Sequence, residues 1–332
     1  MSVSSPDAAH PRFLQKPIKN FGVQIYLISP LKQRLTKPLI ALHFASMSVC
    51  SPTSLKIALV QLPVGLDKAQ NLANAVKEIH NAKMKGAELV ALPEFFNAPY
   101  GTQYFNEYAE VVPCGPTSAA LKCAAMEAGV CVVGGTMPER QRDKLYNTCT
   151  VWDQQGNLIA VHRKMHLFDI DIPGGIKFKE SDVLSAGDEI TTFEFRGIKI
   201  GLGICYDLRF FEMAQMMAKE GCSLLLYPGA FNLTTGPRHW ELLGRARAND
   251  LQLWVAMVSP ARDNLASYIA WGHSMVVNPW GVVMKELDEK PGTIIADIDP
   301  QVVEEVRSQI PIRSQRRTDI YDTVSAKLIQ KK

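Results

Sequence analysis

The chain has 332 residues, of which 47% are hydrophobic and 21% are charged. This is the composition of an ordinary globular protein that can build a large core. No apolar run approaches the length that spans a bilayer, so we expect no membrane segment. Residues 54–332 hold 30 basic and 32 acidic residues, a formal net charge of −2, so we expect no nucleic-acid partner. The seven cysteines without a C-x-x-C pair argue against a disulfide framework and a zinc knuckle, and they favour a reducing compartment.

The positive charge is concentrated in the first 53 residues, which hold six Lys or Arg and one acidic residue, whereas the remainder holds 30 basic and 32 acidic residues. This segment has no clear periodicity, and "MSVSSP" at 1–6 is nearly repeated by "MSVCSP" at 47–52. We interpret 1–53 as an extension that is either disordered or a mitochondrial transit peptide. Met47 is an alternative start. We expect a cytoplasmic protein, or a mitochondrial one if the extension is a targeting signal.

Apolar runs of strand length alternate with segments of helical spacing from residue 55 onward. In the first helix Asp67 is placed to cap the start and Gly86 to end it. The elements expected in the first half are a strand at 55–62, a helix at 67–86, a strand at 87–94, a helix at 117–129, a strand at 130–135 and two strands around a Gln-Gly turn within 145–164.

The second half repeats this pattern, and no linker separates the halves, so we expect one domain. Alternating strands and helices predict an α/β layered fold, and the interspersed hairpins predict mixed sheets. Two sheets packed together with helices outside would bury every apolar face. The expected elements are a strand at 198–205, a helix at 209–221, a strand at 222–228, a helix at 237–250, a strand at 251–259 and a hairpin at 273–286 that turns at 279–281.

Cys205, in "GLGICYDLRF", stands where an apolar strand breaks into charged residues before a helix. A sharp strand–turn–helix presents a nucleophile, and a helix N-terminus stabilises a thiolate. The alternative is a buried apolar cysteine, a description that fits Cys131 and Cys149. A nucleophile also needs a base and a group that stabilises the oxyanion.

Two other strand ends supply candidate partners for the thiol. Glu94, in "LPEFF", ends a buried strand, where desolvation raises the pKa of a carboxyl and suits it to act as a base. Lys164, in "HRKMHLFD", can stabilise an oxyanion. Each could instead be a surface charge in a salt bridge. His162 and His166 are four residues apart, but no nearby acid completes a metal site, and we expect no metal.

Glu94, Lys164 and Cys205 follow one another in the order of the Glu-Lys-Cys triad of the nitrilase superfamily, which the chain resembles over residues 55–322. Within the superfamily the chain is most similar to the ω-amidases. This similarity rests on "FFNAPYGTQYF" (95–105), "HLFDIDIPGGIKFKES" (166–181) and "GAFNLTTGPRHWELL" (229–243).

The resemblance implies a four-layer α-β-β-α sandwich with mixed sheets at 54–322, a tail at 323–332, a homodimer and no cofactor. It implies hydrolysis of ω-amides of 2-oxo dicarboxylic acids through a thioester on Cys205. The implied supporting groups are Glu180 as a second acid and the backbone N–H of Tyr206 at the oxyanion. The implied pocket residues are Tyr100, Arg209 and Phe231.

Arg209 follows the nucleophile by four residues, and its planar guanidinium suits a substrate carboxylate. A salt bridge to Glu212 or Asp207 is the alternative. Tyr100 and Phe231 are expected to wall a short pocket that fits a chain of four or five carbons.

Three other functions stay open at this point. One is a different amidohydrolase of the superfamily, acting on a carbamoyl compound, a nitrile or deaminated glutathione. Another is a non-catalytic interaction protein that kept the fold. A dinucleotide-binding enzyme could be argued from "GLGICYD", but that stretch lacks the third glycine of the fingerprint.

Overall fold

The computed structural model describes residues 54–326. The predictions made for 1–53, namely a disordered or targeting extension and an alternative start at Met47, therefore lie outside the described residues, as does most of the tail at 323–332. Within 54–326 no helix is long and apolar enough to cross a membrane.

The first sheet has seven strands and is built around three parallel ones. β1 pairs in parallel with β2 and β2 with β3, while β15 and β5 add antiparallel strands on either side. β4 and β6 both pair with β5. The strands are, in sheet order, β15 (Gly292–Ile298), β1 (Leu55–Gln61), β2 (Leu89–Ala91), β3 (Cys131–Val133), β5 (Lys144–Trp152) and β4 (Met137–Gln141), with β6 (Leu158–Arg163) off this path.

The second sheet has six strands and repeats the same arrangement. β10, β11 and β12 are parallel, and antiparallel strands flank them. Both sheets are therefore mixed, as the sequence predicted. The strands are, in sheet order, β14 (Val283–Glu286), β13 (Met275–Val277), β12 (Trp254–Val258), β11 (Leu224–Pro228), β10 (Ile198–Leu202) and β9 (Thr191–Phe195).

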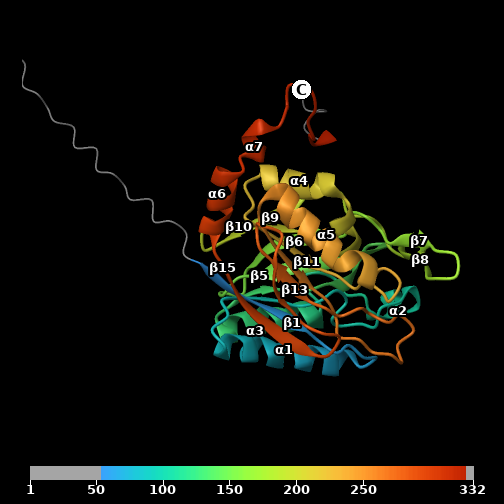
Figure 1. The fold of residues 1–332 in the computed structure, drawn as a ribbon. Helices are drawn as coiled ribbons and strands as arrows, with labels where there is room; N and C mark the ends of the chain where they lie inside the picture. The colour runs from blue at the N-terminus through green and yellow to red at the C-terminus, as the bar shows by residue number, and fades with distance from the viewer. Residues whose placement is uncertain (1–53, 327–332) are drawn as a thin grey trace, which may run out of the picture. The chain divides into compact units, whose positions relative to one another are not determined.

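Period-two alternation assigns the faces of β1. Ile57 and Leu59 join a core that also holds Ile200 and Leu224 of the second sheet, whereas Ala58 and its like-facing neighbours pack against helices. α1 (Lys68–Met84) and α3 (Pro116–Ala128) cover the first sheet, and α4 (Phe211–Lys219) and α5 (Gly236–Leu251) cover the second (Figure 1). The layers run α-β-β-α, which confirms the expected sandwich.

The predicted ends of the first helix are confirmed. The Asp67 carboxylate accepts a hydrogen bond from the Gln70 N–H at 3.1 Å, and Gly86, with φ 86°, follows the last residue of the helix cap, Lys85. Several short or irregular elements were not predicted from the sequence. These are α2 (Thr102–Tyr108), a hairpin of β7 (Asp169–Asp171) and β8 (Lys177–Lys179), the 3₁₀ segments η1 (Glu180–Asp182) and η2 (Cys205–Arg209), α6 (Pro300–Gln309) and α7 (Ile312–Gln315), besides β4, β9 and β15.

Candidate active site

Glu94, Lys164 and Cys205 converge from three strand ends, as the sequence predicted. Glu94 lies three residues after β2, Lys164 directly after β6 and Cys205 three residues after β10. All three side chains are buried. Neighbouring parallel strands end at the same edge of their sheet, and the two sheets face each other, so side chains that are distant in the sequence meet between them.

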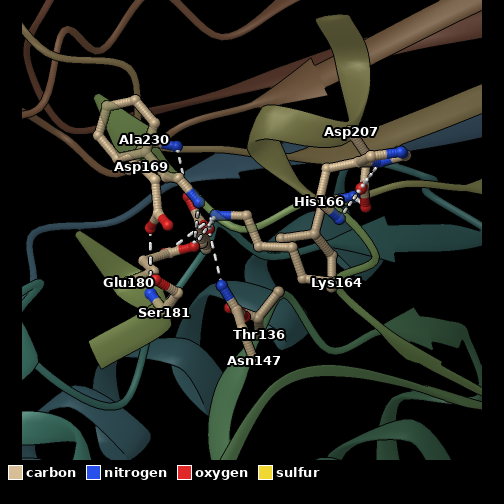
Figure 2. A network of polar contacts seen from close by, with 12 residues as sticks. Thr136, Asn147, Lys164, His166, Asp169, Glu180, Ser181, Asp207 and Ala230 are labelled. Carbon is tan, nitrogen blue, oxygen red and sulfur yellow. Dashed lines mark hydrogen bonds and ion pairs between the residues drawn. The ribbon is translucent and has the colours of Figure 1, made fainter. Parts of the chain in front are cut away.

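The Lys164 ammonium is the centre of a buried polar network (Figure 2). Its Nζ donates to Glu94 Oε1 at 3.1 Å and to Glu180 Oε1 at 2.9 Å, and neither ammonium nor carboxylates have exposed side-chain surface. The two carboxylates raise the pKa of Lys164 well above its usual value, although burial alone would lower it. Lys164 is therefore a fixed positive charge inside the protein.

The two oxygens of Glu94 are held by different partners. Oε1 accepts from the Asn147 amide at 2.8 Å as well as from Lys164, and Oε2 accepts from the Ala230 backbone N–H at 2.8 Å. Burial raises the pKa of Glu94 despite the nearby Lys164 charge, and the Cys205 thiol is also its hydrogen-bond partner. This agrees with the expectation that desolvation prepares the carboxyl to accept a proton.

Glu180, at the start of η1, has no surface exposure and no free oxygen. Oε1 accepts from the Tyr100 hydroxyl at 2.8 Å and from Lys164, while Oε2 accepts from the Phe168 backbone N–H at 2.8 Å. The ammonium is thus held between two carboxylates that are themselves anchored, which fixes its position.

Cys205 occupies a strained turn. Its φ is 47°, in the left-handed region that non-glycine residues seldom adopt. This agrees with the predicted sharp turn after β10. Gly229 allows the neighbouring loop to approach, because a Cβ there would lie 3.2 Å from Cys205 Cα and 3.1 Å from the Trp240 ring.

The expectation that a helix N-terminus stabilises the thiolate is wrong. Burial, and then the negative charge of Glu94, raise the pKa of Cys205 well above its usual value despite Lys164. The residue opens only the five-residue 3₁₀ segment η2, and α4 begins later, at Phe211. The short segment has too small a dipole to offset desolvation, which favours the neutral thiol.

Asp207 links the turn at Cys205 to the loop that follows Lys164. Its buried carboxylate accepts from the backbone N–H of Ile204 and of His166, both at 2.9 Å. It also contacts His166 Nδ1 at 2.8 Å and His162 Nε2 at 3.3 Å. Burial alone would raise the pKa of Asp207, but these hydrogen bonds hold it below its usual range. The two histidines therefore serve this carboxylate, and among residues 54–326 no cluster of three or more His, Cys, Asp or Glu could hold a metal ion.

Arg209 ends η2 with its guanidinium over two aromatic rings, 4.8 Å from the Phe231 centroid and 5.4 Å from that of Tyr206. Nη1 lies 3.2 Å from His239 Nδ1, whereas Nε is buried without a hydrogen-bond partner. Burial lowers the pKa of Arg209 from its usual value. Within the described part of the chain Arg209 has no ion pair, so the alternative of a bridge to Glu212 or Asp207 is not what the structure shows.

A cavity of about 310 Å³ reaches the network from the side of Glu94 and Tyr100. Tyr100 stacks on Tyr268 with ring centroids 4.1 Å apart, and both line the cavity. Phe231 is not part of this wall, because it packs edge-on against Trp240 at 4.9 Å. The structure therefore does not bring Tyr100 and Phe231 together as two walls of this cavity.

Tyr206 follows Cys205 directly, and its ring packs edge-on against Phe168 at 5.3 Å. Sequence reasoning missed three neighbours of the triad: Asn147, the Ala230 N–H and Tyr268, whose hydroxyl donates to the Ala230 carbonyl at 2.6 Å. An amide inside the apolar strand "LYNTCTVW" was a usable signal for the first. No local pattern marks the other two.

Comparison with known proteins identifies the family of the chain. The omega-amidase NIT2 of Xenopus tropicalis is 54% identical over 272 residues, covering 82% of this chain and 98% of that protein. The omega-amidase NIT2 of Homo sapiens is 52% identical over 269 residues, covering 81% and 97%. The crystal structure of Saccharomyces cerevisiae Nit3, a member of branch 10 of the nitrilase superfamily, matches with a TM-score of 0.74 and 41% identity, covering 80% of this chain and 97% of that one. The carbon-nitrogen hydrolase family model matches residues 56–308, and the chain therefore belongs to this family of the nitrilase superfamily, whose members hydrolyse carbon–nitrogen bonds.

Proposed function

We propose that the protein is an ω-amidase that hydrolyses the terminal amide of 2-oxo dicarboxylic acid monoamides, α-ketoglutaramate and α-ketosuccinamate, to the dicarboxylate and ammonia. The observation that carries the proposal is the buried cluster of Glu94, Lys164 and Cys205, which combines a base, a fixed cation and a thiol in one contact network. The omega-amidase relatives, at 52–54% identity, support the choice of substrate class.

In the first half of the reaction, Glu94 takes the thiol proton as Sγ of Cys205 attacks the amide carbon. The carbonyl electron pair moves to its oxygen, where the Lys164 ammonium and the Tyr206 backbone N–H stabilise the negative charge. When the tetrahedral intermediate collapses, Glu94 returns the proton to the leaving nitrogen. Ammonia departs and the acyl group remains as a thioester, which divides one difficult hydrolysis into two easier steps.

In the second half, Glu94 removes a proton from water, and the hydroxide attacks the thioester carbon. The same donors stabilise the second oxyanion, and collapse breaks the C–S bond. Cys205 recovers the proton from Glu94 as the acid leaves. A carboxyl whose pKa is raised by burial serves both directions of this transfer.

Glu180 acts through Lys164 in this scheme. Its carboxylate accepts a hydrogen bond from the Lys164 ammonium and is itself held in place by the Tyr100 hydroxyl and the Phe168 N–H. We assign it a positioning role, because its oxygens are already occupied.

Arg209 is proposed to bind the substrate carboxylate. A guanidinium with a buried, unpaired Nε and no ion pair within residues 54–326 is available for a charge-assisted hydrogen bond. Phe231 supports it by packing under the guanidinium, and Tyr100 borders the cavity beside Glu94.

We propose further that residues 54–322 form the hydrolase domain and that the protein works as a homodimer without a cofactor. The proposed compartment is the cytoplasm, or the mitochondrion if 1–53 is a transit peptide. Other superfamily activities, on carbamoyl compounds, nitriles or deaminated glutathione, share the triad, so only the pocket discriminates among them.

The experiment that tests the function measures ammonia release from a panel of ω-amides, ureides and nitriles, with wild type and Arg209→Lys. The substitution keeps the charge and removes the planar fork, so KM for α-ketoglutaramate should rise more than about tenfold, or 1.4 kcal/mol. An uncharged amide of the same length and the surface variant Arg245→Lys serve as controls. Equal losses on charged and uncharged amides would show that Arg209 is structural. Faster turnover of a ureide or nitrile would reject the substrate class.

A further inference from the structure

A second cavity, of about 150 Å³, lies between the last turns of α4 and α5 and the C-terminal helices α6 and α7. Among residues 54–326, those that line it include four cationic side chains, those of Lys219, Arg307, Arg313 and Arg316, and one carboxylate, that of Asp250. None of these residues belongs to the catalytic network. Such an excess of one charge around a cavity favours an anion.

Three of the four cationic side chains have an ion-pair or hydrogen-bond partner. Lys219 Nζ pairs with Asp322, outside the cavity lining. Arg313 Nη2 donates to the Ala218 carbonyl at 3.2 Å, and Arg316 Nη2 donates to the Asp250 carbonyl at 3.0 Å. These two arginines thus satisfy carbonyls at helix C-termini.

The guanidinium of Arg307 lacks hydrogen-bond partners for two of its three nitrogens. Its Nη1 lies 3.5 Å from the exposed Glu304 carboxylate, but Nε and Nη2 are buried without any hydrogen-bond partner. Burial and the charge of Arg313 lower the pKa of Arg307. Nε and Nη2 form one edge of the guanidinium, the edge whose two parallel N–H groups bind two oxygens of a carboxylate or phosphate.

We propose that this cavity is an anion site that holds a small oxyanion, bearing a phosphate or a carboxylate group, across the Nε–Nη2 edge of Arg307. Arg313 and Arg316 supply the balancing charge. Gln215, on α4, also lines the cavity and has a buried Oε1 without a partner. A protonated oxygen, such as that of hydrogen phosphate, would satisfy this acceptor as well as the two donors.

The bound anion would connect Gln215 of α4 with Arg307 of α6 and Arg313 of α7. It neutralises the mutual repulsion of Arg307 and Arg313, and it fills donors that otherwise stay buried and unpaired. Any ligand that binds only the folded protein raises its melting temperature, and above Kd the rise keeps growing with the logarithm of the ligand concentration.

The test titrates inorganic phosphate, and separately succinate, into the full-length protein at constant ionic strength, with binding followed by calorimetry and by Tm. We expect saturable binding and a rise in Tm with at least one of them. Arg307→Lys keeps the charge but loses the fork edge, and should weaken Kd at least tenfold. Arg313→Gln should weaken it too, and this variant covers the case in which the Arg307 variant folds poorly.

Two control variants define the site. Arg317→Lys changes a neighbouring surface arginine that pairs with Asp319, and it should leave Kd unchanged. Arg209→Lys should also leave it unchanged, which separates this site from the proposed substrate carboxylate site. Binding of succinate alone with the same dependence on Arg307 supports the carboxylate form of the proposal. Absence of saturable binding by either anion, or affinity that is equal in the Arg307 and Arg317 variants, overturns it.

Discussion

Replacing Lys164 by Met is the substitution whose energetic cost follows most directly from the structure. The wild-type cluster holds two carboxylates and one ammonium, and none of the three side chains is exposed. Methionine keeps much of the side-chain volume but leaves Glu94 and Glu180 as two buried carboxylates without a cation. Removing one partner of a buried ion pair costs about 3–5 kcal/mol, and here both carboxylates lose the same partner, so we expect the upper part of that range.

The matched control is Lys177→Met. Lys177 contacts Asp171 at 2.7 Å, a shorter distance than either contact of Lys164, but both side chains are mostly exposed. Exposed ion pairs contribute little to stability because water screens them, so this substitution should not measurably change the free energy of unfolding. The comparison separates burial from distance as the quantity that sets the cost.

The pH dependence of the Lys164→Met deficit has a definite sign. Burial already raises the pKa of Glu94, and the variant removes the Lys164 charge that opposes this shift. The folded variant then keeps a proton on Glu94 that the unfolded chain releases above about pH 4.3, the usual pKa of Glu. The free energy of unfolding of the variant therefore falls as pH rises from this value to the raised pKa of Glu94. Its deficit relative to wild type shrinks as pH falls toward the unfolded pKa.

Urea denaturation of wild type and both variants, at several pH values, checks these statements. Equally small losses of unfolding free energy in Lys164→Met and Lys177→Met would refute the reasoning, since they would mean that the buried carboxylates tolerate the missing cation. A deficit that is constant with pH would refute the proton uptake.

Three further predictions concern the nucleophile, the base and the extension. Cys205→Ala should abolish ammonia release with Tm retained, whereas Cys149→Ala, in the core of β5, should lower Tm and keep turnover; activity in the first variant would sink the proposed mechanism. Glu94→Gln keeps the shape but removes the base, and kcat should fall at least ~10²-fold; full-rate accumulation of acyl-enzyme in mass spectrometry would restrict Glu94 to the water step. Removing residues 1–46 should leave kcat and Tm nearly unchanged, because the first core strand begins at Leu55; a large drop in Tm would contradict this.

The layered fold was predictable because its evidence is periodic. Strands such as 55–61 and helices such as 68–84 repeat their apolar residues over enough positions to be recognised. The hairpin of β7 and β8 was not predictable in this way, since two strands of three residues carry no periodicity. That hairpin is followed directly by Glu180, so the position of this site residue depends on an element that no sequence pattern predicts.

The meeting of Glu94, Lys164 and Cys205 was predictable because each places a reactive group at the end of a strand. The upward shift of the Cys205 pKa was not, because the argument from its local turn took no account of burial or of Glu94, which is 111 positions away in the sequence. Asn147 and Ala230 escaped for a related reason. Their function is set by a hydrogen bond to Glu94 across the fold, and the Ala230 contribution comes from the backbone, which no side-chain pattern reveals.

Asp207 shows how such a long-range contact can be tested. Its carboxylate holds the N–H groups of Ile204 and His166, residues adjacent or close to Cys205 and Lys164. In Asp207→Asn one of the two oxygens becomes an NH₂ group, which must face one of these backbone donors in either orientation of the amide. An unsatisfied buried donor costs about 1–3 kcal/mol, and relaxation should move the nucleophile relative to the ammonium. We therefore expect kcat to fall about tenfold or more with KM little changed, since a small misplacement suffices for such a loss. Steady-state kinetics on α-ketoglutaramate measure the split. A rise in KM with kcat intact would show that Asp207 shapes the substrate pocket and does not position the triad.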